Sequence, residues 1–201
     1  MTTATATDHH GIEPAESPLT PESWGKLGMW NFLAADAMTF GALLAGYGAL
    51  RYGDPNWPVP SSILGIPLTA AMTFLLICSS MTMVESLTGI RQGNQAKCLR
   101  FLLLTILGGA LFLGLQAYEW THLLHAGQSV GRDNFGATFF VLTGFHGMHV
   151  FSGVVYLSVI AIRAALGKYS ADNNNEVEIV GLYWHFVDLV WILVFTFVYL
   201  V

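Results

Sequence analysis

Long apolar runs separated by short polar breaks fill the chain from about residue 26 onward. A helix needs about 20 mostly apolar residues, at about 1.5 Å per residue, to cross the hydrocarbon core of a bilayer. Five runs meet this requirement: residues 27–50, 63–90, 99–121, 135–162 and 179–201. The pattern therefore predicts an all-α integral membrane bundle of five transmembrane helices, with short connections that make neighbouring helices antiparallel.

The composition of the chain agrees with this prediction. Of its 201 residues, 54% are hydrophobic and only 10% are charged, and the mean hydropathy is +0.55. Soluble proteins carry about a quarter charged residues. A soluble helical bundle would also need a polar stripe along each helix, and these runs lack one. We therefore exclude a soluble protein.

The N-terminal segment differs from the rest, and we divide the chain into a polar tail, residues 1–25, and a five-helix transmembrane domain, residues 26–201. The tail is rich in Thr, Ala, Pro and acidic residues. No basic stretch precedes an apolar one, so it is not a cleavable signal peptide. Its low hydrophobicity predicts a disordered cytoplasmic tail, and it contains His9 and His10.

The basic residues predict the orientation of the bundle, because short cytoplasmic loops retain Lys and Arg. The side that holds the N-terminus carries six of them, whereas the opposite side carries Arg51 and Arg132; the six are Lys26, Arg91, Lys97, Arg100, Arg163 and Lys168. The N-terminus is therefore predicted to be cytoplasmic and the C-terminus periplasmic. Cys78 and Cys98 are interpreted as ordinary small residues.

Ionisable residues in the middle of the predicted helices are the strongest candidates for a function. Asp36 and Asp188 each lie nine residues into a helix that enters from the cytoplasmic side. Inserting a carboxylate at the centre of a transmembrane helix costs about 2.5–3.5 kcal/mol on insertion scales. His146 and His149, on the fourth helix, fall at a similar depth, as does His185. Residues three apart share a helix face. We therefore predict one structural polar layer contributed by the first, fourth and fifth helices.

Several chemistries are compatible with such a layer. Histidines on facing helices could bind a haem, and Glu119 and His122 have the Glu-x-x-His spacing of di-iron bundles, although no second motif accompanies them. The favoured interpretation is that His and Asp bond one another and fix helix packing. A proton relay stays open. The acids Glu85 and Glu119 lie near helix ends, where water is within reach, and are secondary candidates.

Four segments resemble one known family, subunit III of haem-copper terminal oxidases, in its short five-helix form. They are residues 144–150 (GFHGMHV), residues 183–188 (YWHFVD) followed by Val190 and Trp191, residues 116–119 (QAYE) and residues 32–40. The likeness runs from about Lys26 to the last residue, with the motifs in the family's order. Aspartate at position 36, where the family usually has glutamate, resembles the bo-type quinol oxidases more than the mitochondrial cytochrome c oxidases.

The resemblance implies a role without a redox centre in this chain. Such a protein belongs to a proton-pumping complex of the bacterial cytoplasmic (inner) membrane that reduces dioxygen to water, contacts subunits I and II, and binds phospholipid but no nucleic acid. Haem and copper lie in the partner subunits, so the family implies that His146, His149, His185 and Asp188 are structural contacts and that this chain holds no metal.

Further expectations also follow from the resemblance. Asp36 stands at the family's intramembrane acid, and Arg163 at a basic residue that contacts a phospholipid headgroup. The chain would shield the proton uptake path of subunit I and steady that subunit, and His9 and His10 could collect protons, since imidazoles titrate near neutral pH. The alternatives are an accessory protein of nitric oxide reduction and a haem b quinone-binding membrane anchor.

Overall fold

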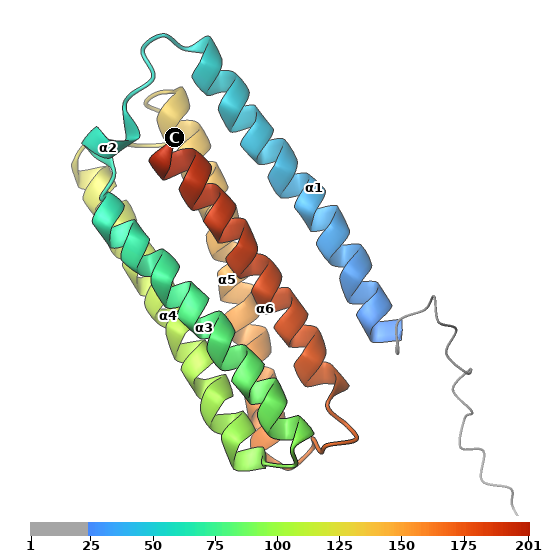
Figure 1. Cartoon of the computed structure of the whole chain (residues 1–201). Coiled ribbons are helices and arrows are strands. Elements are labelled where there is room, and N and C mark those ends of the chain that lie inside the picture. Colours follow the sequence, from blue (N-terminus) through green and yellow to red (C-terminus); the bar gives the residue numbers. More distant parts are fainter. Residues whose placement is uncertain (1–23) are drawn as a thin grey trace, which may run out of the picture.

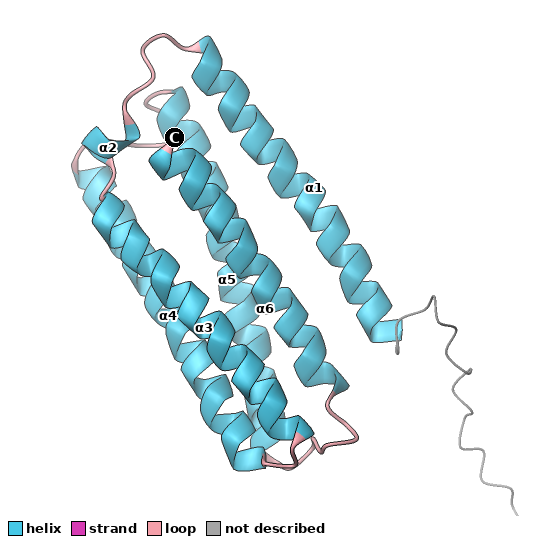
Figure 2. Cartoon of the chain, in the orientation of Figure 1, coloured by secondary structure: helices cyan, strands magenta, loops and turns pink. Residues whose placement is uncertain are grey.

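The computed structural model describes residues 24–201, and this part of the chain consists of helices joined by short loops, without a strand (Figures 1 and 2). Its elements are α1 (Trp24–Gly53), α2 (Pro60–Ile63), α3 (Ile66–Arg91), α4 (Gln95–His125), α5 (Asn134–Ala165), α6 (Asn175–Val194) and the π-helical segment η1 (Phe195–Leu200). Five helices are long and apolar enough to cross a membrane, α6 being continued by η1. The prediction of an all-α protein with five helices long enough to span a membrane is confirmed.

The five long helices form a bundle with one peripheral member. The helix α3 packs on α4 and α6, and α5 packs on α4 and α6, so these four helices close a ring. The helix α1 packs on α5 and α6 from outside this ring, at the edge of the molecule (Figure 1). Its buried residues share one side of the helix at spacings of three, four or seven, and they are Lys26, Leu33, Asp36, Phe40 and Tyr47.

The turns between the helices fall in the polar breaks that separate the apolar runs of the sequence. Asn94 caps α4 by accepting a hydrogen bond from the Lys97 amide at 2.9 Å, and Asp133 caps α5 in the same way from the Gly136 amide at 2.6 Å. The helix α3 ends at Arg91, and Gly93 follows two residues later with a φ of 72°, in the left-handed region that favours glycine. Local chemistry therefore sets where these helices begin and end.

Glycines bring α3, α4, α5 and α6 into close contact. A Cβ atom at Gly108 would lie 2.8 Å from the Ser79 Cβ atom, and one at Gly109 would lie 2.5 Å from the Trp184 ring. A Cβ atom at Gly153 would come within 2.9 Å of the same ring. Trp184 therefore occupies a slot that only glycine leaves open on α4 and α5. Close approach of this kind drives helix association in lipid, where the hydrophobic effect between helices is weak.

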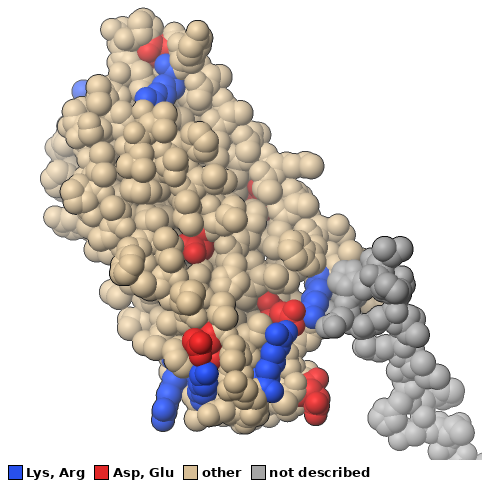
Figure 3. Space-filling view, in the orientation of Figure 1, with Lys and Arg blue, Asp and Glu red and all other residues tan. Residues whose placement is uncertain are grey.

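Charged side chains gather at the two ends of the bundle (Figure 3). The end formed by the start of α1, the α3–α4 and α5–α6 turns and the start of α6 is called the basic end here, and it carries Lys26, Arg91, Lys97, Arg100, Arg163 and Lys168. Arg51 and Arg132 lie at the opposite end. The same uneven distribution of basic residues supports the predicted orientation, and the orientation of the bundle in the membrane stays a prediction.

Candidate functional site

A buried acid–imidazole pair joins α1 to α5 near the middle of both helices. The Asp36 Oδ1 atom lies 3.3 Å from His149 Nε2, and the exposed fraction of the Asp36 side chain is only 8%. The other ring nitrogen, His149 Nδ1, lies 2.8 Å from the Phe145 carbonyl oxygen, which can only accept. Nδ1 therefore carries a hydrogen, and Nε2 faces the Asp36 carboxyl group. A buried carboxyl group with an imidazole partner avoids the cost of a buried polar group that has no partner.

His146 lies one helical turn before His149 but has different surroundings. It is fully buried, and its ring centroid lies 4.9 Å from that of Trp191, 5.7 Å from that of Phe112 and 6.3 Å from that of Phe40. Within the described part of the chain, neither ring nitrogen has a hydrogen-bond partner. The prediction that histidine and aspartate bond one another therefore fits His149, whereas His146 acts as a packed aromatic ring.

The haem hypothesis for these histidines stays a hypothesis. In this structure both ring nitrogens of His149 are engaged, and aromatic rings pack beside His146. Among residues 24–201, no group of three or more His, Cys, Asp or Glu side chains is placed to hold a metal ion.

Asp188 takes part in a second polar contact, away from Asp36. Its Oδ2 atom accepts a hydrogen bond of 2.7 Å from the Ser80 hydroxyl of α3. His185, three residues earlier, is half-buried beside it. Asp36 and His149 thus join α1 to α5, whereas Asp188 joins α6 to α3. A single polar layer contributed by the first, fourth and fifth helices stays a prediction.

A series of further hydrogen bonds follows the contact between α3 and α6. The Trp184 indole N–H donates to the Ser79 hydroxyl, and the Trp191 indole N–H donates to the Thr73 hydroxyl, each over 3.0 Å. Sequence reasoning missed this seam because serine and threonine are ordinary residues in a transmembrane helix. The spacing of the hydroxyl residues could have indicated this contact, because it places Thr73 and Ser80 on one face of α3.

Glu119 is buried, which corrects the expectation that water reaches it. Only 4% of this residue is exposed. Its two carboxyl oxygens accept hydrogen bonds from the Thr69 hydroxyl at 3.0 Å and the Tyr199 hydroxyl at 2.9 Å. The π-helical segment η1 holds Tyr199, and such segments often mark special sites. By contrast, Glu85 is half-exposed at the basic end, 2.8 Å from Lys97 Nζ.

Arg163 is engaged within the chain at the basic end. Its Nη1 atom lies 2.6 Å from Glu176 Oε2, which also accepts a hydrogen bond of 2.6 Å from the Tyr169 hydroxyl. Burial and the Glu176 carboxylate raise the pKa of Tyr169, so this phenol stays protonated and continues to donate. The Arg163 side chain is nearly half exposed, so its guanidinium also faces the surroundings of the bundle.

A second carboxylate at the basic end, that of Glu178, joins α6 to α1 and α3. Its Oε2 atom lies 3.1 Å from Lys26 Nζ and 2.8 Å from Arg91 Nη2.

The candidates His9 and His10 lie outside the described residues.

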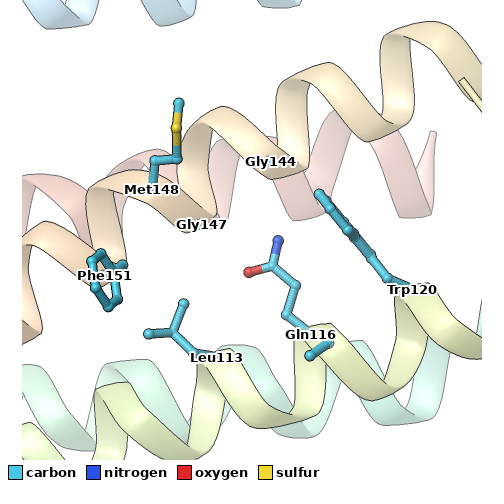
Figure 4. A pocket seen from close by; sticks show the side chains of 8 residues that line it. Leu113, Gln116, Trp120, Gly144, Gly147, Met148 and Phe151 are labelled. Carbon is cyan, nitrogen blue, oxygen red and sulfur yellow. The ribbon is translucent and has the colours of Figure 1, made fainter.

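A shallow groove with a volume of 310 Å³ runs between α4 and α5 (Figure 4). Gln116 and Trp120 reach from α4 toward α5, where Gly144 and Gly147 lack the side chains that would block them. The Gln116 amide donates to the Thr143 carbonyl oxygen over 2.7 Å. The remaining lining is apolar and consists of Leu113, Ala117, Met148 and Phe151. The four motifs singled out in the sequence thus supply helix contacts.

The fold and site define a class of protein, a five-span membrane bundle whose buried polar residues join helices to one another. Known proteins narrow this class to one family. The family described as cytochrome c oxidase subunit III matches residues 26–201, and the chain therefore belongs to it.

Named relatives of the chain come from several bacteria. The probable quinol oxidase subunit 3 of Staphylococcus saprophyticus is 36% identical over 177 residues, 88% of each chain. The probable cytochrome c oxidase subunit 3 of Nocardia farcinica is 33% identical over the whole of both chains. The quinol oxidase subunit 3 of Bacillus subtilis is 34% identical over 87% of this chain and 85% of its own. The resemblance drawn from the sequence motifs is confirmed.

Proposed function

We propose that this chain is the non-catalytic subunit III of a proton-pumping haem-copper terminal oxidase in the cytoplasmic membrane of a bacterium. The observation that carries the proposal is the family match over residues 26–201. The relatives are named as subunits of quinol and cytochrome c oxidases. The contacts of the buried acids and imidazoles support a structural role, because most of these groups are engaged in joining helices.

The orientation in the membrane follows from the charge asymmetry. The basic end faces the cytoplasm, because Lys and Arg in short loops stay on that side. The N-terminus of α1 is then cytoplasmic and the end of η1 periplasmic. Asp36 and His149 lie near the bilayer midplane in this arrangement, while Arg163 and Glu178 lie at the inner interface.

The partners in this function are oxidase subunits I and II, with direct contact to subunit I, and membrane phospholipid. The bundle shields the entrance of the proton uptake path of subunit I and steadies that subunit through many turnovers. The half-exposed guanidinium of Arg163 attracts a lipid phosphate at the inner interface. The redox groups, haem and copper, belong to the partners. His9 and His10 add proton-collecting groups on the same side.

Purification of the tagged chain from its native membrane tests the proposal. We expect haem-containing and copper-containing subunits to co-purify, and the complex to consume oxygen with either a quinol or cytochrome c as donor. Removal of this chain from the complex should leave the initial rate nearly unchanged and shorten the active lifetime. A chain that purifies without such partners, or with a complex that reduces nitric oxide and not oxygen, would overturn the proposal.

A further inference from the structure

The face shared by α3 and α6 carries a polar group at mid-membrane depth that the chain itself leaves incompletely covered. Asp188 lies 13 residues beyond Asn175 and 12 before Leu200, the two ends of the α6–η1 span. Ser80, its hydrogen-bond donor, lies 14 residues beyond Ile66 and 11 before Arg91 on α3. Both counts place the contact near the middle of the bilayer, because each residue of a helix adds about 1.5 Å.

His185 lies on the outer flank of this contact. Its ring is half-buried, and no hydrogen bond of residues 24–201 involves it. The second oxygen of Asp188, Oδ1, also lacks a donor within that part of the chain and is shielded from its surface. Imidazole, carboxyl and hydroxyl groups therefore form a cluster with unused hydrogen-bonding capacity, and we name His185, Asp188 and Ser80 the midplane cluster.

Large apolar side chains surround the midplane cluster on the same face. Leu189 and Ile192 lie four and seven residues after His185 on α6, and Ile77 and Val84 lie three before and four after Ser80 on α3. All four are exposed, and these spacings place each beside the cluster. Acidic atoms are visible on the surface between the two charged ends in the view of Figure 3. The surface is thus apolar with a polar centre.

Lipid is a poor cover for such a surface. A hydrocarbon tail offers no hydrogen bond, and a polar group that faces it without a partner costs free energy. Ionisable residues within spans accordingly face protein or water. A neighbouring helix can cover the apolar flanks and bond the half-buried imidazole of His185 at once.

We propose that the α3–α6 face centred on His185 is the docking surface for a transmembrane helix of a partner subunit, which brings a hydrogen-bonding side chain to mid-membrane depth. This inference rests on the proposed function, since it assigns a surface to an oxidase partner. Asp188 is a positioning residue in this arrangement, because it lies beside the imidazole and is itself held by Ser80. The partner helix contacts His185, Leu189 and Ile77.

Site-specific photocrosslinking in the intact complex tests the assignment. A benzophenone amino acid replaces Leu189, whose exposed fraction is 57%, and a matched variant carries it at Met148 on α5, with an exposed fraction of 61%. We expect capture of another oxidase subunit from position 189 and not from position 148. Capture of lipid alone, of a second copy of this chain, or equal capture of a partner from both positions would overturn the inference. Co-purification of the oxidase alongside any of these results would leave the proposed function standing.

Substitution of His185 separates docking from exposure to lipid. If a partner side chain bonds the imidazole, His185→Leu leaves that side chain unpaired, and retention of the chain in detergent should fall about threefold to tenfold. His185→Gln should restore most of the retention, since an amide can still donate and accept. If the face is lipid-covered, His185→Leu should be neutral or improve retention, and that result would overturn the inference. The level of each variant in the membrane is measured first, so that loss of folding is distinguished from loss of docking.

Discussion

Replacement of Asp36 with alanine tests whether the buried acid–imidazole pair holds α1 on the bundle. The helix α1 packs mainly on α5 and α6, outside the ring of the other four long helices. Its contact with His149 lies between two other polar ties, Lys26 with Glu178 near the basic end and the Tyr47 hydroxyl with the Val198 carbonyl oxygen near the opposite end. The Asp36–His149 pair is therefore the polar contact that holds the middle of α1 on the bundle.

The expected cost follows from what Asp36→Ala leaves behind. His149 keeps its Nδ1 hydrogen bond but loses the partner of Nε2, and an unsatisfied buried polar group costs about 1–3 kcal/mol. Asp36→Asn should cost less, about 1 kcal/mol or below, because its amide can donate to Nε2. Replacement of both Asp36 and His149 with leucine removes both polar groups, so its cost should be smaller than the sum of the single leucine replacements.

The assay compares attachment with catalysis in the assembled oxidase. We expect Asp36→Ala to leave the initial rate of oxygen consumption nearly unchanged, while retention of the chain in detergent and the number of turnovers before inactivation both fall. Met38→Ala is the matched control, since this side chain of α1 is 78% exposed. Additive single and double effects, or an equal loss for Met38→Ala, would refute the reasoning. An immediate and complete loss of turnover in a fully assembled complex would show a more direct role for Asp36.

Two further predictions concern packing inside the bundle. Gly109→Ala should destabilise the bundle by about 1–3 kcal/mol in thermal unfolding, because its Cβ atom would clash with an indole ring of α6, whereas Gly114→Ala on the same helix meets nothing and should be neutral or stabilising. Tyr199→Phe should lower the stability of the bundle by about 1–3 kcal/mol, because it leaves one oxygen of the buried Glu119 carboxyl without its donor. Tyr118→Phe is the exposed control and should have little effect on stability. Equal effects of the two tyrosine replacements would contradict this expectation.

The sequence predicted the long helices well because their signals are local. Each of the five runs contains enough apolar residues to span a bilayer, and the breaks between them contain the caps and glycines that end helices. The start of α6 lies four residues before the predicted position 179, since the polar residues Asn175 and Glu176 belong to its first turn. The short helix α2 and the π-helical η1 were not predicted, because hydropathy carries no signal for either.

The candidate site was predictable in part. Asp36 and His149 fall at matching depths, and the structure joins them. Matching depth did not identify the partner of Asp188, which is Ser80 of α3. For Glu119, its place near a helix end indicated water within reach, whereas Tyr199 and Thr69 bury it. In both cases the missing information is the identity of the neighbouring helix.

The sequence by itself thus determined that the chain has five helices long and apolar enough to cross a membrane, how far along its helix each ionisable group lies, and which family the motifs indicate. These properties depend on counting residues along a helix of fixed rise. The tertiary structure alone decided which helix each polar side chain meets. Partners depend on how the helices are rotated and packed against one another, and in this bundle that is set by contacts between distant residues, such as the slot that Gly109 and Gly153 form for Trp184. Residues far apart in the chain must meet before such contacts exist, so no local pattern encodes them.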